Sequence, residues 1–93
     1  MQAQADDLDQ PLSERALSKL KWRCRRGLLE NDLFIERFFQ RHEAGLTVRQ
    51  ARALDALMDL SDHDLLDLFL QRKEPEPPVA GTDVADLLRL MRV

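Results

Sequence analysis

The sequence predicts an all-α fold, a small bundle of about five helices. Three observations predict it. Apolar residues recur at spacings of three and four along most of the chain, which places them on single helical faces. Glycines and prolines stand between these stretches and not inside them. Neither strand-like alternation nor an internal repeat is present. A chain of 93 residues fits one domain, and its core should be shallow because only about 60 to 65% of its unfolded surface can be buried.

The chain is expected to begin with a flexible acidic arm over residues 1–12, which are polar, carry three acids and contain Pro11 near their end. A single helical domain should then occupy residues 13–93. Its first helix is predicted from Ser13 to Arg26, a stretch without Gly or Pro in which Leu17, Leu20 and Cys24 share one face. Gly27 is expected to stop this helix.

The second helix is predicted from Leu28 to His42, with its end marked by Gly45. Its apolar stripe consists of Leu28, Ile35, Phe38 and Phe39. Leu29 and Leu33 fall on a different side. This pattern indicates a helix that is buried twice, once in the domain and once against a partner; the alternative is that a small bundle wraps it.

The third and fourth helices are predicted from their caps. Thr47 and Gln50 form a capping-box pattern, and Ser61 precedes acids that favour a helix start. The third helix should bury Ala53, Leu54, Leu57, Met58 and Leu60, and the fourth Leu65, Leu66, Leu68 and Phe69.

Residues 72–78 must break the fourth helix, since three prolines in four residues cannot continue its hydrogen bonds. The last helix is expected to start with Thr82 as its cap. Its apolar side consists of Val84, Leu87, Leu88 and Met91 and should close the bundle.

The sequence predicts no catalytic, metal-binding or cofactor-binding residues. The single cysteine, Cys24, has no identifiable base beside it, and His42 and His63 do not give zinc-ligand spacing. Asp62 and Asp64 are better explained as capping acids than as a catalytic pair, and Asp59 does not complete a metal loop with them. We therefore expect a protein that is not an enzyme.

A cytoplasmic location is expected. The first seven residues lack the apolar run of a secretory signal, and no apolar stretch approaches the roughly 20 residues that span a bilayer. One cysteine without a possible intrachain disulfide is typical of a reducing compartment.

Charge is distributed unevenly along the chain. Residues 11–26 carry a net charge of +5, whereas the segments before and after carry −3 and −5. Such a basic segment could bind nucleic acid, and a small nucleic-acid-associated regulator is the alternative function. The pI near 5.3 argues against it, because a net negative domain would repel a polyanion.

The densest group of unusual residues lies between Arg25 and Glu30. Local physics offers one explanation, in which Arg25 and Arg26 favour a helix C-terminus, Gly27 takes a left-handed cap position and Glu30 starts the next helix. The functional explanation is that Gly27 lets another protein approach the backbone closely while Arg26 and Glu30 offer opposite charges on either side.

The chain resembles the small succinate dehydrogenase assembly factors that promote covalent attachment of FAD, from about Leu20 to Leu90. The stretch that carries the resemblance best is Trp22-Arg23-Cys24-Arg25-Arg26-Gly27-Leu28-Leu29-Glu30-Asn31-Asp32, which contains the family's Arg-Gly-x-x-Glu motif. Also similar are Phe38-Phe39, Leu46-Thr47 and Asp62-His63-Asp64-Leu65. Phe69 departs from the many members that have tryptophan there, but it keeps an aromatic ring, so packing should survive.

The resemblance implies a five-helix domain that binds the flavoprotein subunit of succinate dehydrogenase, with the fumarate reductase flavoprotein as a second candidate client. The partner would carry both the histidine and the flavin, and this chain would bind no cofactor stably. The partner-binding residues that match the motif are Arg26, Gly27 and Glu30, with Trp22, Arg25 and Asp32 as flanking positions. This resemblance favours the functional explanation of the Arg25 to Glu30 segment.

Overall fold

The computed structural model describes residues 8–25, 27–76 and 81–92. Within them the fold is all-α, with five α-helices, one 3-10 turn and no strand, as the sequence predicts. The helices are α2 (Glu14–Arg23), α3 (Leu29–His42), α4 (Val48–Leu57), α5 (Asp62–Phe69) and α6 (Thr82–Met91), and the 3-10 turn η1 is Glu43–Gly45.

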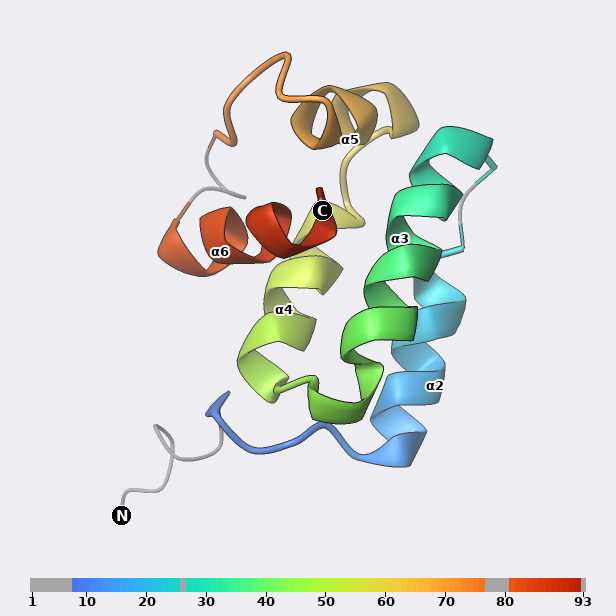
Figure 1. Cartoon of the computed structure of the whole chain (residues 1–93), viewed down its shortest axis with the longest axis vertical. Helices are drawn as coiled ribbons and strands as arrows, with labels where there is room; N and C mark the ends of the chain where they lie inside the picture. Colours follow the sequence, from blue (N-terminus) through green and yellow to red (C-terminus); the bar gives the residue numbers. More distant parts are fainter. Residues whose placement is uncertain (1–7, 26, 77–80, 93) are drawn as a thin grey trace.

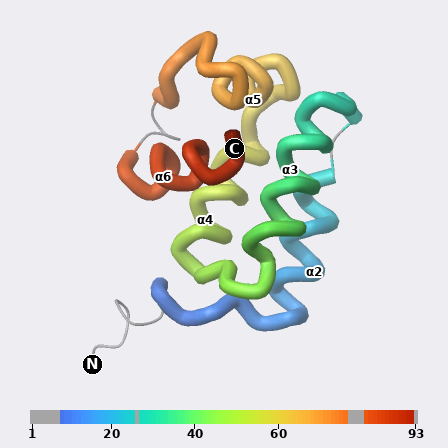
Figure 2. Tube along the Cα trace, viewed as in Figure 1, coloured from blue at the N-terminus to red at the C-terminus, as the bar shows by residue number. Residues whose placement is uncertain are grey.

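The chain runs up α2, back down α3, and then through η1 into α4, so that α2 and α3 lie side by side in opposite directions (Figure 1). Helix α6 packs mainly on α4, and α3 also contacts both α5 and α6. The trace in Figure 2 shows that the connection between α2 and α3 lies at the edge of the bundle, far from the first described residues.

The core forms where the predicted apolar faces meet. Its largest fully buried apolar side chains are Phe38, Leu46, Leu54, Leu57, Leu65, Leu68, Leu87, Leu88 and Met91. Three predicted core residues, Leu28, Leu60 and Leu66, are only half-buried. Phe69 is buried and stacks on Phe34 with 4.8 Å between ring centroids, so the aromatic packing expected at this position is present.

Side-chain caps start three of the helices, and two of them, Thr47 and Ser61, are the caps that the sequence predicts. The hydroxyl oxygens of Ser13, Thr47 and Ser61 each accept a hydrogen bond from the backbone N–H three residues later, at 3.1 to 3.2 Å. The Gln50 side chain also accepts from the backbone N–H of Thr47 at 3.0 Å, which completes the capping box.

Two predicted helix ends are wrong. Helix α2 ends at Arg23, and the N–H of its C-cap, Cys24, donates the last helical hydrogen bond to the Leu20 carbonyl. Residues 24–28 then connect α2 to the antiparallel helix α3. Gly27 therefore does not terminate it. Thr82 is the first residue of α6 and not its cap, because Gly81, with a φ of 129°, turns the chain into the helix.

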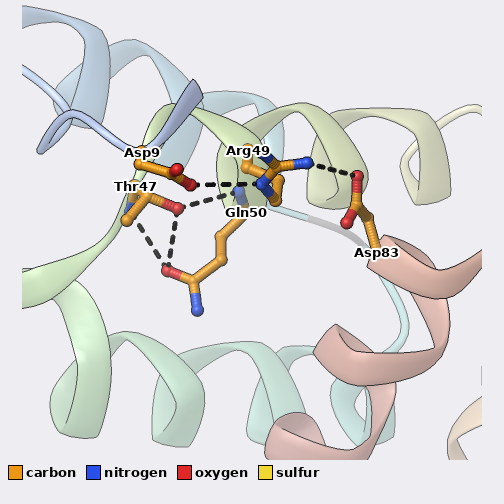
Figure 3. A network of polar contacts seen from close by, with 5 residues as sticks. All are labelled: Asp9, Thr47, Arg49, Gln50 and Asp83. Atoms are coloured by element: carbon orange, nitrogen blue, oxygen red, sulfur yellow. Dashed lines mark hydrogen bonds and ion pairs between the residues drawn. The ribbon is translucent and has the colours of Figure 1, made fainter. Parts of the chain in front are cut away.

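The described end of the predicted N-terminal arm is attached to the domain. The Leu12 N–H donates to the Leu46 carbonyl at 2.8 Å, and the Val48 N–H donates to the Gln10 carbonyl at 3.0 Å. Arg49 lies between Asp9 and Asp83, with N–O distances of 3.3 and 3.5 Å (Figure 3). Residues 1–7 of the arm lie outside the described residues, as do Pro77 and Pro78 of the predicted linker.

None of the helices in the described part of the chain is long and apolar enough to span a membrane.

Candidate functional site

Trp22 and Arg25 form an exposed pair at the end of α2. Trp22 is 71% exposed, which is unusual for the largest apolar side chain. The Arg25 guanidinium lies over its ring, 5.0 Å from the centroid. The cation orients the indole without covering it, so a flat apolar face remains available beside a positive charge.

An open groove of about 700 Å³ runs between α2 and α3, and it brings three of the predicted site residues together. Trp22, Arg25 and Asp32 all line it. Buried Cys24, Ile35 and Phe39 also contribute to its lining and make it partly apolar. The Lys21 ammonium and the Glu43 carboxylate meet across α2 and η1 at 2.8 Å and belong to the same lining.

Gly27 lies in the connection between the helices with open space around it. A Cβ atom built on Gly27 would meet no atom within 4 Å, chain neighbours excepted. Its φ is not positive, unlike that of Gly81. The predicted left-handed cap at Gly27 is therefore wrong, and neither internal packing nor backbone conformation requires glycine here. Arg26, the other predicted residue of this connection, lies outside the described residues.

Glu30 lies in the first turn of α3 and is exposed, as predicted. Among the described residues it has no ion-pair partner. Asp32 shares this turn and is half-buried. The N-cap residue Leu28 contributes no side-chain hydrogen bond, so the two carboxylates supply the negative charge that a helix N-terminus favours.

The structure shows that Arg23 and Arg25, which the sequence does not distinguish, differ in whether an acid of the domain pairs with them. The Arg23 guanidinium donates to the Asp55 carboxylate and, at 2.7 Å, to the Asp59 carboxylate, and thereby joins α2 to α4. These hydrogen bonds, the one to Asp55 above all, raise the pKa of Arg23 above its ordinary value. Arg23 is occupied inside the domain, whereas Arg25 carries no ion pair among the described residues.

Asn31 is a residue to which the sequence reasoning gave no role. It is fully buried, and its amide nitrogen donates to the Asp62 carbonyl at 2.9 Å. Its Oδ1 atom is buried without a hydrogen-bond partner. Asn31 thus fixes the first turn of α3, which carries Glu30, against the start of α5. The sequence feature that could have indicated this role is the helical spacing, which places polar Asn31 on the same face as Ile35 and Phe38.

Exposed apolar side chains gather on both sides of the connection. The large apolar residues that stand exposed in the described chain are Trp22, Leu29, Leu33 and Leu70. Three of these four flank Gly27 within a dozen residues. The prediction that Leu29 and Leu33 lie outside the core stripe of their helix is confirmed.

Groups that could carry chemistry are not assembled in the described residues. Cys24 is buried and forms no disulfide, and the His42 ring packs on Phe38 at 5.2 Å between centroids. Across residues 8–25, 27–76 and 81–92 there is no group of three His, Cys, Asp or Glu side chains that could hold a metal ion. The arrangement of the junction suits contact with another protein.

Comparison with known proteins gives one consistent result. Residues 18–92 match the model of a family described as flavinator of succinate dehydrogenase. A protein of Ralstonia nicotianae named FAD assembly factor SdhE is 49% identical over 75 residues, 81% of this chain and 79% of that protein. A Pseudomonas aeruginosa protein of the same name is 35% identical over 80 residues, 86% of this chain and 87% of that protein. No solved structure matches the chain significantly.

Proposed function

Because the chain belongs to the flavinator family of succinate dehydrogenase, we propose that it binds the flavoprotein subunit of that enzyme and promotes covalent attachment of FAD to a histidine of the subunit. Its relatives are named assembly factors, and the chain is accordingly an assembly factor and not an enzyme. The fumarate reductase flavoprotein is a second proposed client.

The observation that supports this proposal best is the surface around the α2–α3 connection, here called the junction surface, made of Trp22, Arg25, Gly27, Glu30 and Asp32. It combines an exposed aromatic ring, the opposite charges of Arg25 and Glu30, which have no ion-pair partner among the described residues, and a glycine that the fold itself does not require. Aromatic and arginine side chains are the groups that most often dominate protein interfaces. Arg26 belongs to the proposed surface through its place in the sequence motif.

The proposed mechanism is positioning. The flavoprotein supplies the histidine and the flavin, and this chain holds the flavoprotein in a conformation in which the two meet in reacting geometry. The junction surface offers binding groups and no nucleophile, because its only neighbouring thiol, Cys24, is buried. A buried thiol outside any disulfide is compatible with the cytoplasm, which is the proposed location.

A nucleic-acid partner is not part of the proposal. Two of the bases that make α2 positive are occupied by acids, Arg23 by Asp55 and Asp59, and Lys21 by Glu43. These pairs reduce the positive potential that phosphate binding requires.

Substitution of Gly27 tests the proposal. Gly27→Arg should leave the helical fold intact, since the site is open and its φ is not positive, but the long side chain should obstruct the partner. The variant is co-expressed with the flavoprotein in a strain that lacks the factor, and covalent flavin is measured by in-gel fluorescence after denaturation. We expect strong loss of signal with an unchanged circular dichroism spectrum. Full restoration of covalent flavin by Gly27→Arg would refute the junction surface.

Glu30→Ala supplies the charge test in the same system. Loss of this exposed carboxylate should weaken the complex by about 1 to 3 kcal/mol if it contacts a cation of the partner. A pull-down with the flavoprotein measures the change. Unchanged binding would show that Glu30 serves only the start of α3.

A further inference from the structure

Helix α3 has a second apolar side besides its core face. Leu29 is 67% exposed and Leu33 is 49% exposed, and they lie one turn apart, so both side chains occupy the same side of the helix. Ile35, Phe38 and Phe39 fill the opposite side and are buried. Leu29 and Leu33 therefore form a short apolar strip that the described chain leaves uncovered.

The strip is continuous with the junction surface. Leu29 lies between Gly27 and Glu30 in the sequence, and Leu33 extends the strip by one turn toward the middle of α3. The buried residues of α4, α5 and α6 belong to the same core cluster as Ile35, Phe38 and Phe39, so these helices pack on the core side of α3 and not on the strip. A partner that contacts Gly27 and Glu30 would therefore also contact Leu29, and a slightly larger contact would include Leu33.

Unpaired charges of opposite sign lie on the two sides of this region. The exposed cation of α3 in this region, Arg37, lies over the Phe34 ring of its own helix. Arg25 stands on the α2 side, stacked on Trp22, and Glu30 and Glu36 stand on α3. Among the described residues none of the three has an ion-pair partner. Charges arranged in this way fix the orientation of a partner, because the reversed arrangement would place like charges together.

We infer that the docking surface extends along α3 through Leu29 to Leu33, and that it is covered by an apolar segment of the flavoprotein with basic groups facing Glu30 and Glu36 and an acidic group facing Arg25. This inference rests on the proposed function, because the occupant is the same partner. It adds two apolar residues and Glu36 to the contact and fixes the polarity of the partner's surface.

Truncation of the strip tests its apolar part. The dissociation constant of the purified full-length chain and the flavoprotein subunit is measured by calorimetry for Leu33→Ala, Leu29→Ala and the control Leu70→Ala. Leu70 is similarly exposed, at 43%, but belongs to the end of α5. We expect an increase of about 10-fold for each strip variant and less than about 2-fold for the control, since loss of a buried leucine costs more than one power of ten in affinity.

The possible outcomes separate the two proposals. If the wild-type chain binds the flavoprotein and Leu33→Ala binds equally well, the strip is not part of the interface and only this inference fails. If Leu70→Ala weakens binding as much as Leu33→Ala, the effect is not specific to the strip and the inference fails as well. If the wild-type chain does not bind the flavoprotein, the proposed function itself is refuted.

Reversal of charge tests the polarity. Glu36→Lys should raise the dissociation constant by about 10-fold at low salt, with a smaller effect at high salt because exposed charges are screened. Glu74→Lys is the control, since Glu74 is an exposed acid outside α3. Tighter binding by Glu36→Lys would show that the partner presents acids to α3 and would overturn the proposed orientation.

Discussion

At two positions of this chain, the backbone conformation is not the one that the residue type favours. Gly27 is the residue that the sequence favours for a left-handed position, yet its φ is not positive. Gln71, just beyond α5, has a φ of 61°. The Arg72 N–H reaches back to the Asp67 carbonyl at 2.8 Å, and this bond closes the helix end around Gln71. At these two positions, glycine is present at Gly27, where the fold does not need it, and absent at Gln71, where the backbone would favour it.

Gln71→Gly should stabilise the protein. A residue with a Cβ atom pays a steric cost in the left-handed region that glycine avoids, so we expect the free energy of unfolding to rise by about 0.5 to 1 kcal/mol. Gly27→Ala is the matched comparison and should not lower stability, because its Cβ meets open space. Urea unfolding followed by circular dichroism measures both. A destabilised Gln71→Gly would mean that its side chain makes a contact worth more than the backbone strain.

At the scale of the helices, α5 depends on polar contacts at its first turn. Asp64 donates a hydrogen bond from its backbone N–H to the hydroxyl oxygen of the helix cap, Ser61. Its carboxylate also accepts from the Lys73 ammonium at 2.9 Å. The hydrogen bond from Lys73 lowers the pKa of Asp64, and the same bond raises the pKa of Lys73. The segment after α5 is in this way tied back to the start of the helix.

The Asp64–Lys73 pair should make stability depend on pH. Because the pKa of Asp64 is lower in the folded state, its contribution is complete above the unfolded value near 3.8 and is lost as the pH falls through the lowered value. Wild type should therefore exceed Asp64→Asn in stability at neutral pH, and the difference should shrink below about pH 4. Thermal unfolding from pH 7 to pH 2 measures it.

Lys73→Met is the complementary variant. This substitution removes the main cause of the lowered pKa of Asp64 and leaves the Asp64 carboxylate in place. The pH dependence of stability should therefore decrease by about as much as in Asp64→Asn. Both groups are exposed, and the effect should be small. An Asp64→Asn difference that stays constant down to pH 2 would contradict the role of the pair.

At the scale of the whole molecule, Arg49 connects parts that are distant in sequence. It bridges Asp9 in the N-terminal segment and Asp83 in the first turn of α6, from its own position in the first turn of α4 (Figure 3). The backbone bonds of Gln10 and Leu12 to Val48 and Leu46 lie beside it. One side chain therefore helps to hold the N-terminal segment and the start of α6 against α4.

Arg49→Ala should destabilise the protein moderately. Each exposed ion pair is worth about 0.2 to 1 kcal/mol, so the loss of two should lower the free energy of unfolding by about 1 kcal/mol at low salt and by less in high salt. Hydrogen exchange of the Val48 amide should also accelerate, because its acceptor belongs to the released segment. Arg52→Ala, on the same helix and without an ion pair in the described chain, should change neither. Equal effects of the two substitutions would exclude the bridging role.

The sequence by itself determined the helices and most of their faces. The apolar spacings of α3, α4 and α6, the caps Ser13, Thr47 and Ser61, and the exposure of Leu29 and Leu33 are local properties. A helix repeats every 3.6 residues and a cap involves a few consecutive residues, so such features can be read from neighbouring positions. The same local pattern, together with the family resemblance, located the junction between Trp22 and Asp32.

Only the tertiary structure decided which residues of that junction are free to bind. Arg23 is occupied by Asp55 of α4 and by Asp59 just beyond that helix, both more than 30 positions away in the sequence, whereas Arg25 has no ion pair among the described residues. Three further features likewise depend on how the helices pack together: the early end of α2, the buried Asn31–Asp62 contact and the open space at Gly27. Contacts between distant segments leave no periodic signal, because their geometry arises from packing and not from spacing along the chain.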